Sequence, residues 1–337
     1  MKTSATNRRL RVLLTAIANE TLIPRPDFQR RLVWTNRDKV EFLRTVLQGY
    51  PFPEIYVAAG KVDSATGEGT ELLVDGQQRL TTLYQYFKGD EHLRLPPDVP
   101  PYAELSEKEK LEFLEYEVVV RDLGNLPIET IREVFLRINS TSYGLNAMEI
   151  HNARYAGAFK QFGERVAQHQ FFVDHQMFSP SEIRRMDDIR YCLGLIVTIM
   201  STYFNRDSEL ENFLERYNEE FEEENVVYSE VEGTLKAIEQ LGLDRRSRAF
   251  KKADFFTLFV EIHRALFKKR IQVDIERTAQ ALQEFYEEVE RVAHGRLNDE
   301  SPASQYYRAA LQASNDRRNR IIRGSIIESR IVPLGSR

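Results

Sequence analysis

Apolar and polar residues follow two distinct periods along the first half of the chain. Apolar residues spaced at i, i+3, i+4 and i+7 are typical of amphipathic helices, and short apolar runs bounded by Gly, Pro or Asp are typical of strands. The helical period predicts helices at residues 10–18, 36–48, 80–87 and 128–138, and a short charged helix that begins after Ser106. The apolar runs predict strands at residues 54–59 and 116–121 and a third strand that ends at Asp75.

Strand patterns nearly disappear beyond about Asn146, and helical patterns continue through the rest of the sequence. An arrangement of mixed elements followed by helices alone is typical of two separately packed regions. At 337 residues the chain is long enough for two domains with their own cores. The predicted fold class is therefore α+β, with a small mixed sheet in an N-terminal domain of residues 1–150 and an all-α domain of residues 151–337.

The transition from strand to helix at Asp75-Gly76-Gln77-Gln78-Arg79 carries the chemistry most characteristic of a site. The first amides of a helix lack intrahelical partners and lie at the positive end of its dipole, so they attract anions. Arg79 adds a planar cation suited to phosphate, and Gln77 and Gln78 can position a phosphate oxygen or a water. Asp75 would repel phosphate unless a divalent cation lies between them. The box predicts a nucleotide-phosphate site with Mg²⁺ on Asp75; the alternative is an ordinary Asp-Gly turn and a solvated arginine.

Composition narrows the classes of partner. The net charge of −5 argues against a broadly cationic nucleic-acid coat, so any DNA contact would be local. The single cysteine excludes a disulfide framework and a cysteine-built zinc site. The most apolar run, around residues 191–204, is too short for a bilayer and is expected to form a buried core helix. These features predict a cytoplasmic protein with no membrane association, and the sequence leaves its oligomeric state open, a homo-oligomer included.

Several motifs, taken in order, carry a family resemblance. They are Gln29-Arg30 with Val33-Trp34, residues 49–53 (Gly-Tyr-Pro-Phe-Pro), residues 75–79 with the Leu-Thr-Thr-Leu continuation at 80–83, Phe135-x-Arg137-Ile138-Asn139, and Leu145 with Glu149-Ile150 and Asn152-Ala153. Together they resemble the GmrSD-type N-terminal domain family over roughly residues 15–160. The resemblance implies a core similar to that of ParB N-terminal domains and sulfiredoxin, and membership of a prokaryotic anti-phage defence or restriction system.

The resemblance also implies roles for individual residues. The box that the family associates with nucleotide binding and hydrolysis corresponds to Asp75, Gly76, Gln77, Gln78 and Arg79, so the expected activity is a Mg²⁺-dependent NTPase, GTPase-like or broad. Asp75, Gln77, Gln78 and Arg79 would be catalytic, with Asp75 holding the metal. The nucleotide would be bound by Gly76 and Arg79 together with four residues of the flanking motifs, namely Gln29, Arg30, Arg137 and Asn139.

The chain departs from relatives that continue into a His-Asn-His nuclease domain. Such a site needs a histidine to activate water beside a metal ligand. The six histidines here are scattered without that pairing, at positions 92, 151, 169, 175, 263 and 294. Nuclease activity is therefore expected of a separate effector that acts in trans. The alternative function is a non-hydrolysing module, either a reader of modified DNA or an antitoxin-like partner.

Charged residues gather in three stretches of the second half. An acidic run covers residues 209–224, and basic clusters cover residues 245–252 and 317–323. The basic clusters are compatible with contacts to DNA phosphates or with balancing the acidic run. This asymmetry of charge also suits a surface on which an effector protein docks.

Overall fold

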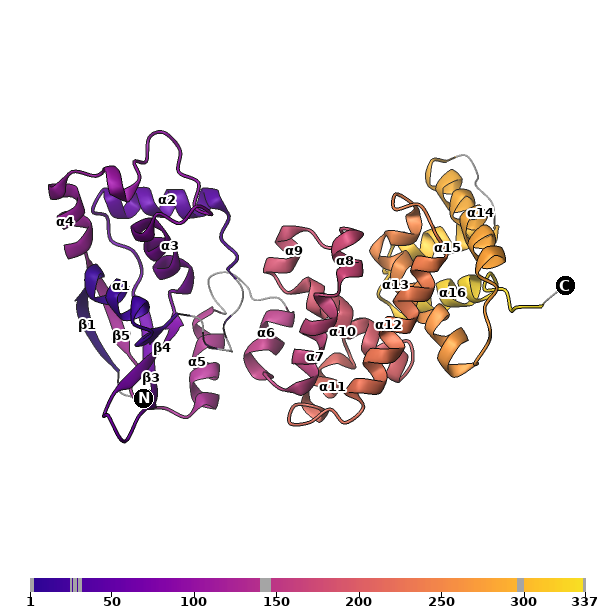
Figure 1. Cartoon of the computed structure of the whole chain (residues 1–337), viewed down its shortest axis with the longest axis horizontal. Coiled ribbons are helices and arrows are strands. Elements are labelled where there is room, and N and C mark those ends of the chain that lie inside the picture. The colour runs from indigo at the N-terminus through magenta and orange to yellow at the C-terminus, as the bar shows by residue number, and fades with distance from the viewer. Residues whose placement is uncertain are drawn as a thin grey trace. The chain divides into compact units, whose positions relative to one another are not determined.

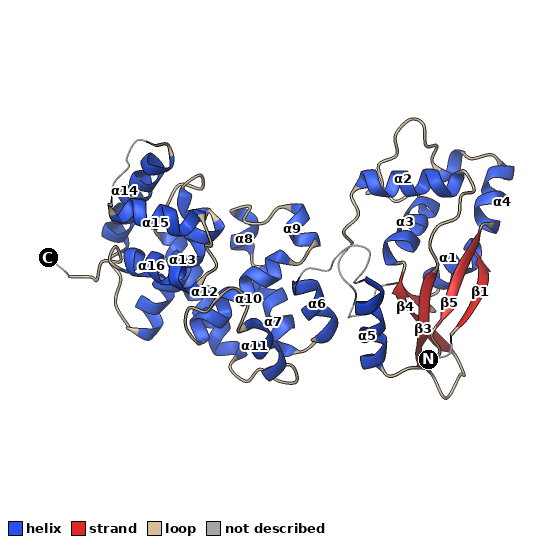
Figure 2. Cartoon of the chain, turned by 180° about the vertical axis from the view of Figure 1, so that it is seen from behind, coloured by secondary structure: helices blue, strands red, loops and turns tan. Residues whose placement is uncertain are grey.

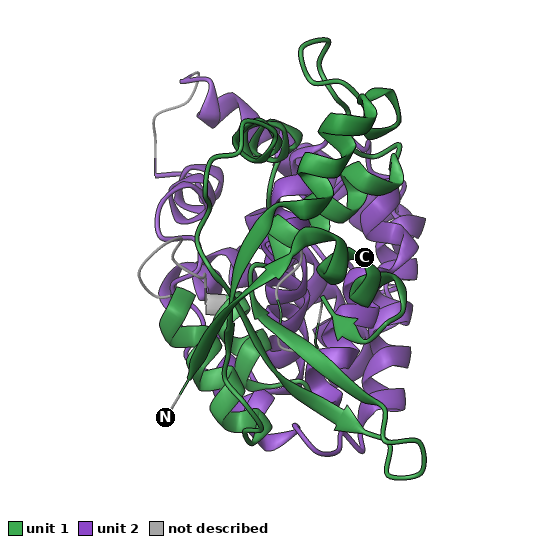
Figure 3. Cartoon of the chain, turned by 90° about the vertical axis from the view of Figure 1, so that its left-hand side faces the viewer, with its two compact units in different colours: residues 1–156 green, residues 157–337 purple. Residues whose placement is uncertain are grey.

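The computed structural model describes residues 3–24, 26, 29, 32–139, 147–295 and 300–335. It divides into two compact units, residues 1–156 and 157–337 (Figures 1 and 3). The first unit contains a five-stranded sheet with helices and the second is helical (Figure 2), which confirms the predicted α+β class. The division falls after Ala156, whereas the sequence analysis placed the boundary after residue 150. Across the described ranges, no helix combines the length and apolar character needed to cross a bilayer.

Unit 1 contains a sheet of five strands with helices before, between and after them. Its elements are β1 (Ser4–Arg9), α1 (Leu10–Ala18), β2 (Leu22–Ile23), α2 (Asn36–Leu47), β3 (Ile55–Val62), β4 (Gly69–Asp75), α3 (Gln77–Lys88), the 3-10 turn η1 (Tyr102–Glu104), α4 (Glu107–Glu115), β5 (Glu117–Asp122), α5 (Ile128–Asn139) and α6 (Ala147–Arg154). The predicted helix starts are confirmed by their caps, since Thr35 and Ser106 each accept a hydrogen bond from the third backbone amide of the helix that follows.

The sheet is mixed, with the strand order β1-β5-β3-β4-β2. β1 is antiparallel to β5 and β3 is antiparallel to β4, whereas the pairs β3–β5 and β2–β4 are parallel. In the central pair, Tyr56 of β3 lies opposite Asp75, the last residue of β4. This register places the residues that precede β3 beside the junction of β4 with α3.

Alternate residues of the central strands bury opposite faces of the sheet. Val57 and Leu73 point into a core with α1, α2, α3 and α4, which contribute residues such as Leu13, Leu43 and Leu83. The neighbouring residues Ala58 and Val74 face a smaller core made with α5 and α6, which holds Ile131, Phe135 and Ala153. Because side chains alternate across a strand, β3 and β4 are covered by helices on both faces.

Unit 2 consists of helices. Its elements are α7 (Ala158–Ala167), α8 (Gln170–Asp174), α9 (Pro180–Arg184), α10 (Asp187–Met200), α11 (Leu210–Arg216), α12 (Glu224–Gln240), the 3-10 turn η2 (Arg248–Phe250), α13 (Lys252–His263), the π-helical turn η3 (Arg264–Lys268), α14 (Ile275–Ala293), α15 (Pro302–Leu311) and α16 (Arg317–Glu328). The most apolar run forms α10, which is buried along most of its length and packs against α7 and α13. The expectation of a core helix here is confirmed.

Three arginines of the basic clusters lie inside unit 2. Arg248 forms an ion pair with the buried Asp254, at 3.2 Å. Arg323 is 1% exposed and donates to Thr257 Oγ1 and to two backbone carbonyls. Arg320 is 5% exposed. These three residues are therefore not available for the contacts to DNA phosphates or to an effector considered for the basic clusters, because carbonyls, a carboxylate or aromatic faces surround the guanidinium groups.

Candidate functional site

The junction between β4 and α3 forms the predicted turn from strand to helix. β4 ends at Asp75, Gly76 precedes the first turn of α3, and Leu80 N donates to Gly76 O as the first helical hydrogen bond. No side chain of the described residues caps this end of α3. The amides of Gln77, Gln78 and Arg79 therefore belong to the group that helices leave for an external acceptor.

Gly76 is required by both its backbone angle and its surroundings. Its φ of +102° lies in the left-handed region, and a Cβ added to it would lie 2.5 Å from Ile55 Cγ2. Residues with side chains rarely adopt this angle, and the contact with Ile55 comes from the core of the sheet rather than from a mobile surface group. The glycine thus fixes the distance between β3 and the start of α3.

Gly76→Ala is expected to destabilise unit 1 by about 2–6 kcal/mol, since strain at positive φ and overpacking each cost about 1–3 kcal/mol. Gly89→Ala is the matched control: Gly89 ends the same helix at φ +66°, and a methyl group added there would meet no other atom within 4 Å. Urea unfolding of both variants measures the difference. Equal losses of stability in the two variants would show that Ile55 does not confine the turn.

Asp75 and Arg79 are paired across the turn. Arg79 Nη2 donates to Asp75 Oδ2 at 2.6 Å, and Arg79 Nη1 donates to Pro53 O at 2.7 Å. The two side chains are 12% (Arg79) and 23% (Asp75) exposed, so the pair is largely shielded from water. Pairing with the carboxylate keeps the guanidinium at the amino end of α3. It also fixes one oxygen of Asp75, while Oδ1 makes no hydrogen bond with the described residues.

The glutamine side chains at this end have two roles. Some of their atoms hold neighbouring segments in place, and others make no hydrogen bond with the described residues. Gln78 Oε1 accepts hydrogen bonds from Val33 N and Trp34 N, both at 3.1 Å, and so ties this segment to α3. Gln29 Nε2 donates to Leu73 O and Val74 O at the end of β4. Gln78 Nε2 and Gln77 Oε1 are buried without a partner among the described residues. Buried polar atoms are nearly always hydrogen-bonded, so one donor and one acceptor remain for a ligand or water.

These residues line a cavity of about 610 Å³ in unit 1, a size within the usual range for small-molecule sites. Its polar lining comprises Gln29, Glu54, Asp75, Gly76, Gln77, Gln78, Arg79 and Asn139. Its apolar lining comprises Trp34, Phe42, Phe52, Pro53, Tyr56, Phe135 and Ile138. The cavity therefore combines charged and amide groups from the β4–α3 junction with aromatic rings from other elements.

Two carboxylates line this cavity, and they differ in what they already bind. Glu54 accepts from Tyr56 Oη at 2.6 Å and from Arg121 Nε and Nη2, both at 2.9 Å. Hydrogen bonds from Arg121 and then Tyr56 lower the pKa of Glu54. Asp75 is bound by Arg79 alone among the described side chains, and it is the carboxylate with a remaining oxygen.

The donor set fits a magnesium ion completed by a ligand rather than a metal site made by protein alone. Within the described ranges, no three histidine, cysteine or acidic side chains gather closely enough to hold a metal. Mg²⁺ is commonly held by one or two carboxylates together with substrate phosphates and water. Asp75 meets that requirement at the edge of a cavity that also contains Arg79.

Residues 10–156 match the model described as the N-terminal domain of the GmrSD restriction endonuclease. Unit 1 contains a GmrSD N-terminal domain. This match indicates a component of a restriction or anti-phage system. Searches of curated proteins and of solved structures found no match.

Of the other predicted site residues of the GmrSD N-terminal domain, only some lie in this cavity. Asn139 is buried at the end of α5, lines the cavity and donates to Phe135 O at 2.9 Å. Arg137 lies on the exposed side of α5, pairs with Glu133 one turn away and is absent from the cavity lining. Arg30 lies outside the described residues. The geometry thus gives Arg137 no part in the cavity, because residues two apart on a helix face different directions.

The sequence analysis missed Glu54 and most of the apolar wall. Glu54 follows Pro53 directly before β3, and the register of β3 with β4 brings it beside Asp75. Trp34 and Phe52 pack against Phe42, and they also line the cavity. An acid placed directly before a strand was the available signal for Glu54, but its partner strand could not be identified from spacing.

Proposed function

We propose that the GmrSD N-terminal domain of this chain binds a nucleoside triphosphate with Mg²⁺ and hydrolyses it. The observation that carries the proposal is the joint occurrence, in one cavity, of the amino end of α3, the Asp75–Arg79 pair and an aromatic wall. A nucleoside triphosphate bound with Mg²⁺ has three chemically different parts, namely the phosphates, the metal and the base. The cavity contains groups that suit each of these parts.

The triphosphate would lie at the amino end of α3. The amides of this turn and the Arg79 guanidinium suit phosphate oxygens, and Gln78 Nε2 is a buried donor without a partner among the described residues. Asp75 would hold Mg²⁺, which when bound neutralises charge on the phosphates. Arg79, already held by Asp75 and Pro53 O, would need little rearrangement to reach the phosphates.

The base would lie against the aromatic part of the cavity. Trp34 and Phe52 come from segments flanking α2, and Phe135 and Ile138 come from α5 on the other face of the sheet. Rings of this kind offer stacking surfaces that tolerate different bases. A preference among nucleotides would then come from the polar atoms beside the wall, of which Asn139 is one.

The attacking water would be oriented by Gln77. Gln77 Oε1 is a buried acceptor with no donor among the described residues, and it lines the same cavity as Asp75. An amide oxygen can accept a hydrogen bond from water and hold it in place without acting as a strong base. Asp75 would serve through the metal rather than as a general base, because one of its oxygens is already held by Arg79 and a carboxylate beside phosphates is best tolerated when a cation lies between them.

The output of this nucleotide cycle is proposed to be an effector that acts in trans. Two histidines of unit 2 are engaged within the fold: His175 stacks on Phe171 and Phe250, and the buried His263 contacts Glu230. The helical unit would supply the docking surface, through exposed charges such as Arg245, Arg246 and the acidic residues near α11. Binding of the effector would have to differ between the two nucleotide states.

Phosphate release from each of the four NTPs, with and without DNA, tests the proposed activity. The full chain is expected to release phosphate in the presence of Mg²⁺ and to stop in excess EDTA. Plain or modified plasmid in the same mixtures is expected to stay intact. Phosphate release at the rate of a protein-free blank with all four NTPs would overturn the hydrolysis proposal. Saturable binding of modified DNA alongside that result would favour the alternative function, a reader of DNA modification whose aromatic wall holds the altered base.

A further inference from the structure

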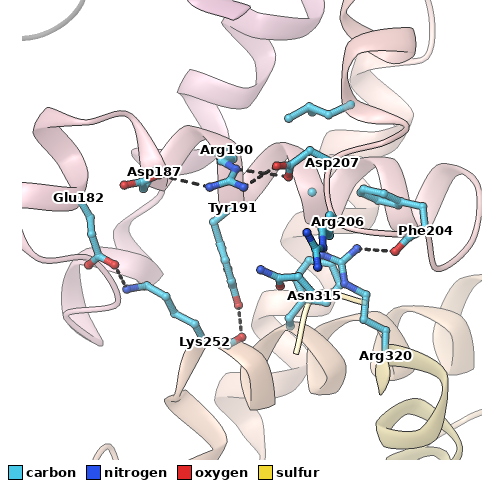
Figure 4. Close-up of a pocket in the computed structure, with 13 residues that line it drawn as sticks. Glu182, Asp187, Arg190, Tyr191, Phe204, Arg206, Asp207, Lys252, Asn315 and Arg320 are labelled. Carbon is cyan, nitrogen blue, oxygen red and sulfur yellow. Dashed lines mark hydrogen bonds and ion pairs between the residues drawn. The ribbon is translucent and has the colours of Figure 1, made fainter. Parts of the chain in front are cut away.

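A second cavity, of about 280 Å³, lies within unit 2 and has no part in the site above (Figure 4). It is formed by α9, α10, the segment between α10 and α11, the first residue of α11, the start of α13, and the start of α16 with the residue before its cap. Its lining combines aromatic side chains, such as Tyr191 and Phe256, with an unusual number of charged groups. The pairing of these charges indicates what the cavity binds.

Three of the four cations in the lining have carboxylate partners. Arg190 pairs with Asp207 and, at 3.8 Å, with Asp187. Lys252 pairs with Glu182. The third, Arg206, pairs with Asp316 at 3.1 Å. The two opposite charges of each pair neutralise each other, so the three cations give the cavity no strong preference for a charged ligand.

Arg320 is the fourth cation of the lining, and it has no carboxylate partner among the described residues. Its side chain lies between Phe204 and Phe256, with the guanidinium carbon 4.8 Å and 4.5 Å from the ring centroids. Nη1 donates to Phe204 O at 3.1 Å, whereas Nε has no partner and no carboxylate forms an ion pair with it in the described part of the chain. Arg320 is 5% exposed and faces the cavity.

A buried cation without an ion-pair partner is unfavourable. Burial, and next the neighbouring Arg323, lower the pKa of Arg320 to about 10, and the carboxylate of Asp207, which is paired with Arg190, opposes this shift only in part. The group still carries its charge at neutral pH. Arg323 can hold its own charge because three acceptors surround it, but Arg320 has one carbonyl and two aromatic faces. An anion in the cavity would supply the missing charge and accept from the guanidinium group.

We propose that this cavity binds a small organic anion through Arg320. Arg320 and the side-chain amide of Asn315, which makes no hydrogen bond with the described residues, lie at one end and would hold a carboxylate or phosphate group (Figure 4). Glu182 and Asp187 lie at the other end. Their carboxylate oxygens can accept hydrogen bonds from hydroxyl or amino groups on the remainder of the ligand. The volume suits a molecule of metabolite size rather than a polymer.

Calorimetric titration of the full chain with two probes tests the proposal and separates its two anion types. The probes are ribose 5-phosphate, a phosphate ester with hydroxyls, and L-serine, a carboxylate with an amine and a hydroxyl. One probe at least is expected to bind saturably at one site. Arg320→Met is expected to weaken that binding about ten- to hundred-fold, since it removes charge-assisted hydrogen bonds. Arg318→Ala, which removes an exposed charge from the same helix, should leave it unchanged.

Two further variants keep the result interpretable. Arg79→Ala alters the unit 1 cavity and should leave binding of the probe unchanged, so the outcome does not depend on the proposed NTPase activity. Asn315→Ala keeps the backbone bond from Arg206 N to Asn315 O and should weaken binding about two- to ten-fold, even if Arg320→Met does not fold. No saturable binding of either probe at millimolar concentration, or equal binding by wild type and Asn315→Ala, would overturn the proposal.

Discussion

Asp75→Asn is expected to abolish Mg²⁺-dependent NTP hydrolysis while leaving the fold of unit 1 intact. The asparagine carbonyl can still accept from Arg79 Nη2, so the 2.6 Å contact that spans the turn has a neutral equivalent. The negative charge that would hold the metal is lost, and with it the neutralisation of phosphate charge. Phosphate release measured over a range of Mg²⁺ concentrations should fall at least about hundred-fold and lose its metal dependence.

Asp98→Asn is the matched control, because Asp98 also pairs with an arginine, Arg44, but lies at the surface outside this cavity. It should hydrolyse NTP at the wild-type rate. Turnover by wild type that persists in excess EDTA, or normal turnover by Asp75→Asn, would rule out the metal role of Asp75.

Arg79→Ala is expected to weaken NTP binding about ten- to hundred-fold. The guanidinium is 12% exposed and lies at the amino end of α3, where charge-assisted bonds to phosphate are worth about 1.5–3 kcal/mol. The variant also leaves Asp75 without its partner, which adds repulsion of the phosphates when metal is absent. The loss of affinity should therefore be larger without Mg²⁺ than with it, and calorimetric titration under both conditions measures this difference.

Arg8→Ala serves as the control for Arg79→Ala. Arg8 forms a two-pronged ion pair with Glu71 at 2.6 and 2.7 Å, so its loss is comparable in chemistry, but neither residue lines the cavity. The affinity of the Arg8→Ala variant for NTP should equal that of wild type. Equal affinities of all three proteins would mean that phosphates do not lie beside Arg79.

The sequence predicted the β4–α3 junction because local rules determine it. The apolar run ending at Asp75, the glycine and the helical period after it each require only neighbouring residues, and the structure confirms the strand, the turn and the helix. The same holds for α2, whose start follows from the capping box of Thr35 with Asp38. The fold class followed from the disappearance of strand patterns after residue 146.

Features that depend on tertiary contacts escaped prediction. β1 consists of polar and small residues, Ser4–Arg9, and it forms a strand by pairing with β5 at the edge of the sheet rather than by burying apolar side chains. Glu54 joins the cavity through the register of β3 with β4. The burial of Arg320 and Arg323 contradicts the usual exposure of arginine, and depends on carbonyls and rings contributed by distant segments.

Fluorescence of Trp34 tests the central claim most directly. The chain contains a single tryptophan, and it lines the unit 1 cavity where the base is proposed to stack. Titration with Mg²⁺ and a slowly hydrolysed NTP analogue is predicted to change its emission saturably, with a midpoint that rises about ten- to hundred-fold in Arg79→Ala. Calorimetric binding of the analogue with no change in Trp34 emission, or no binding at all at millimolar concentration, would contradict the account.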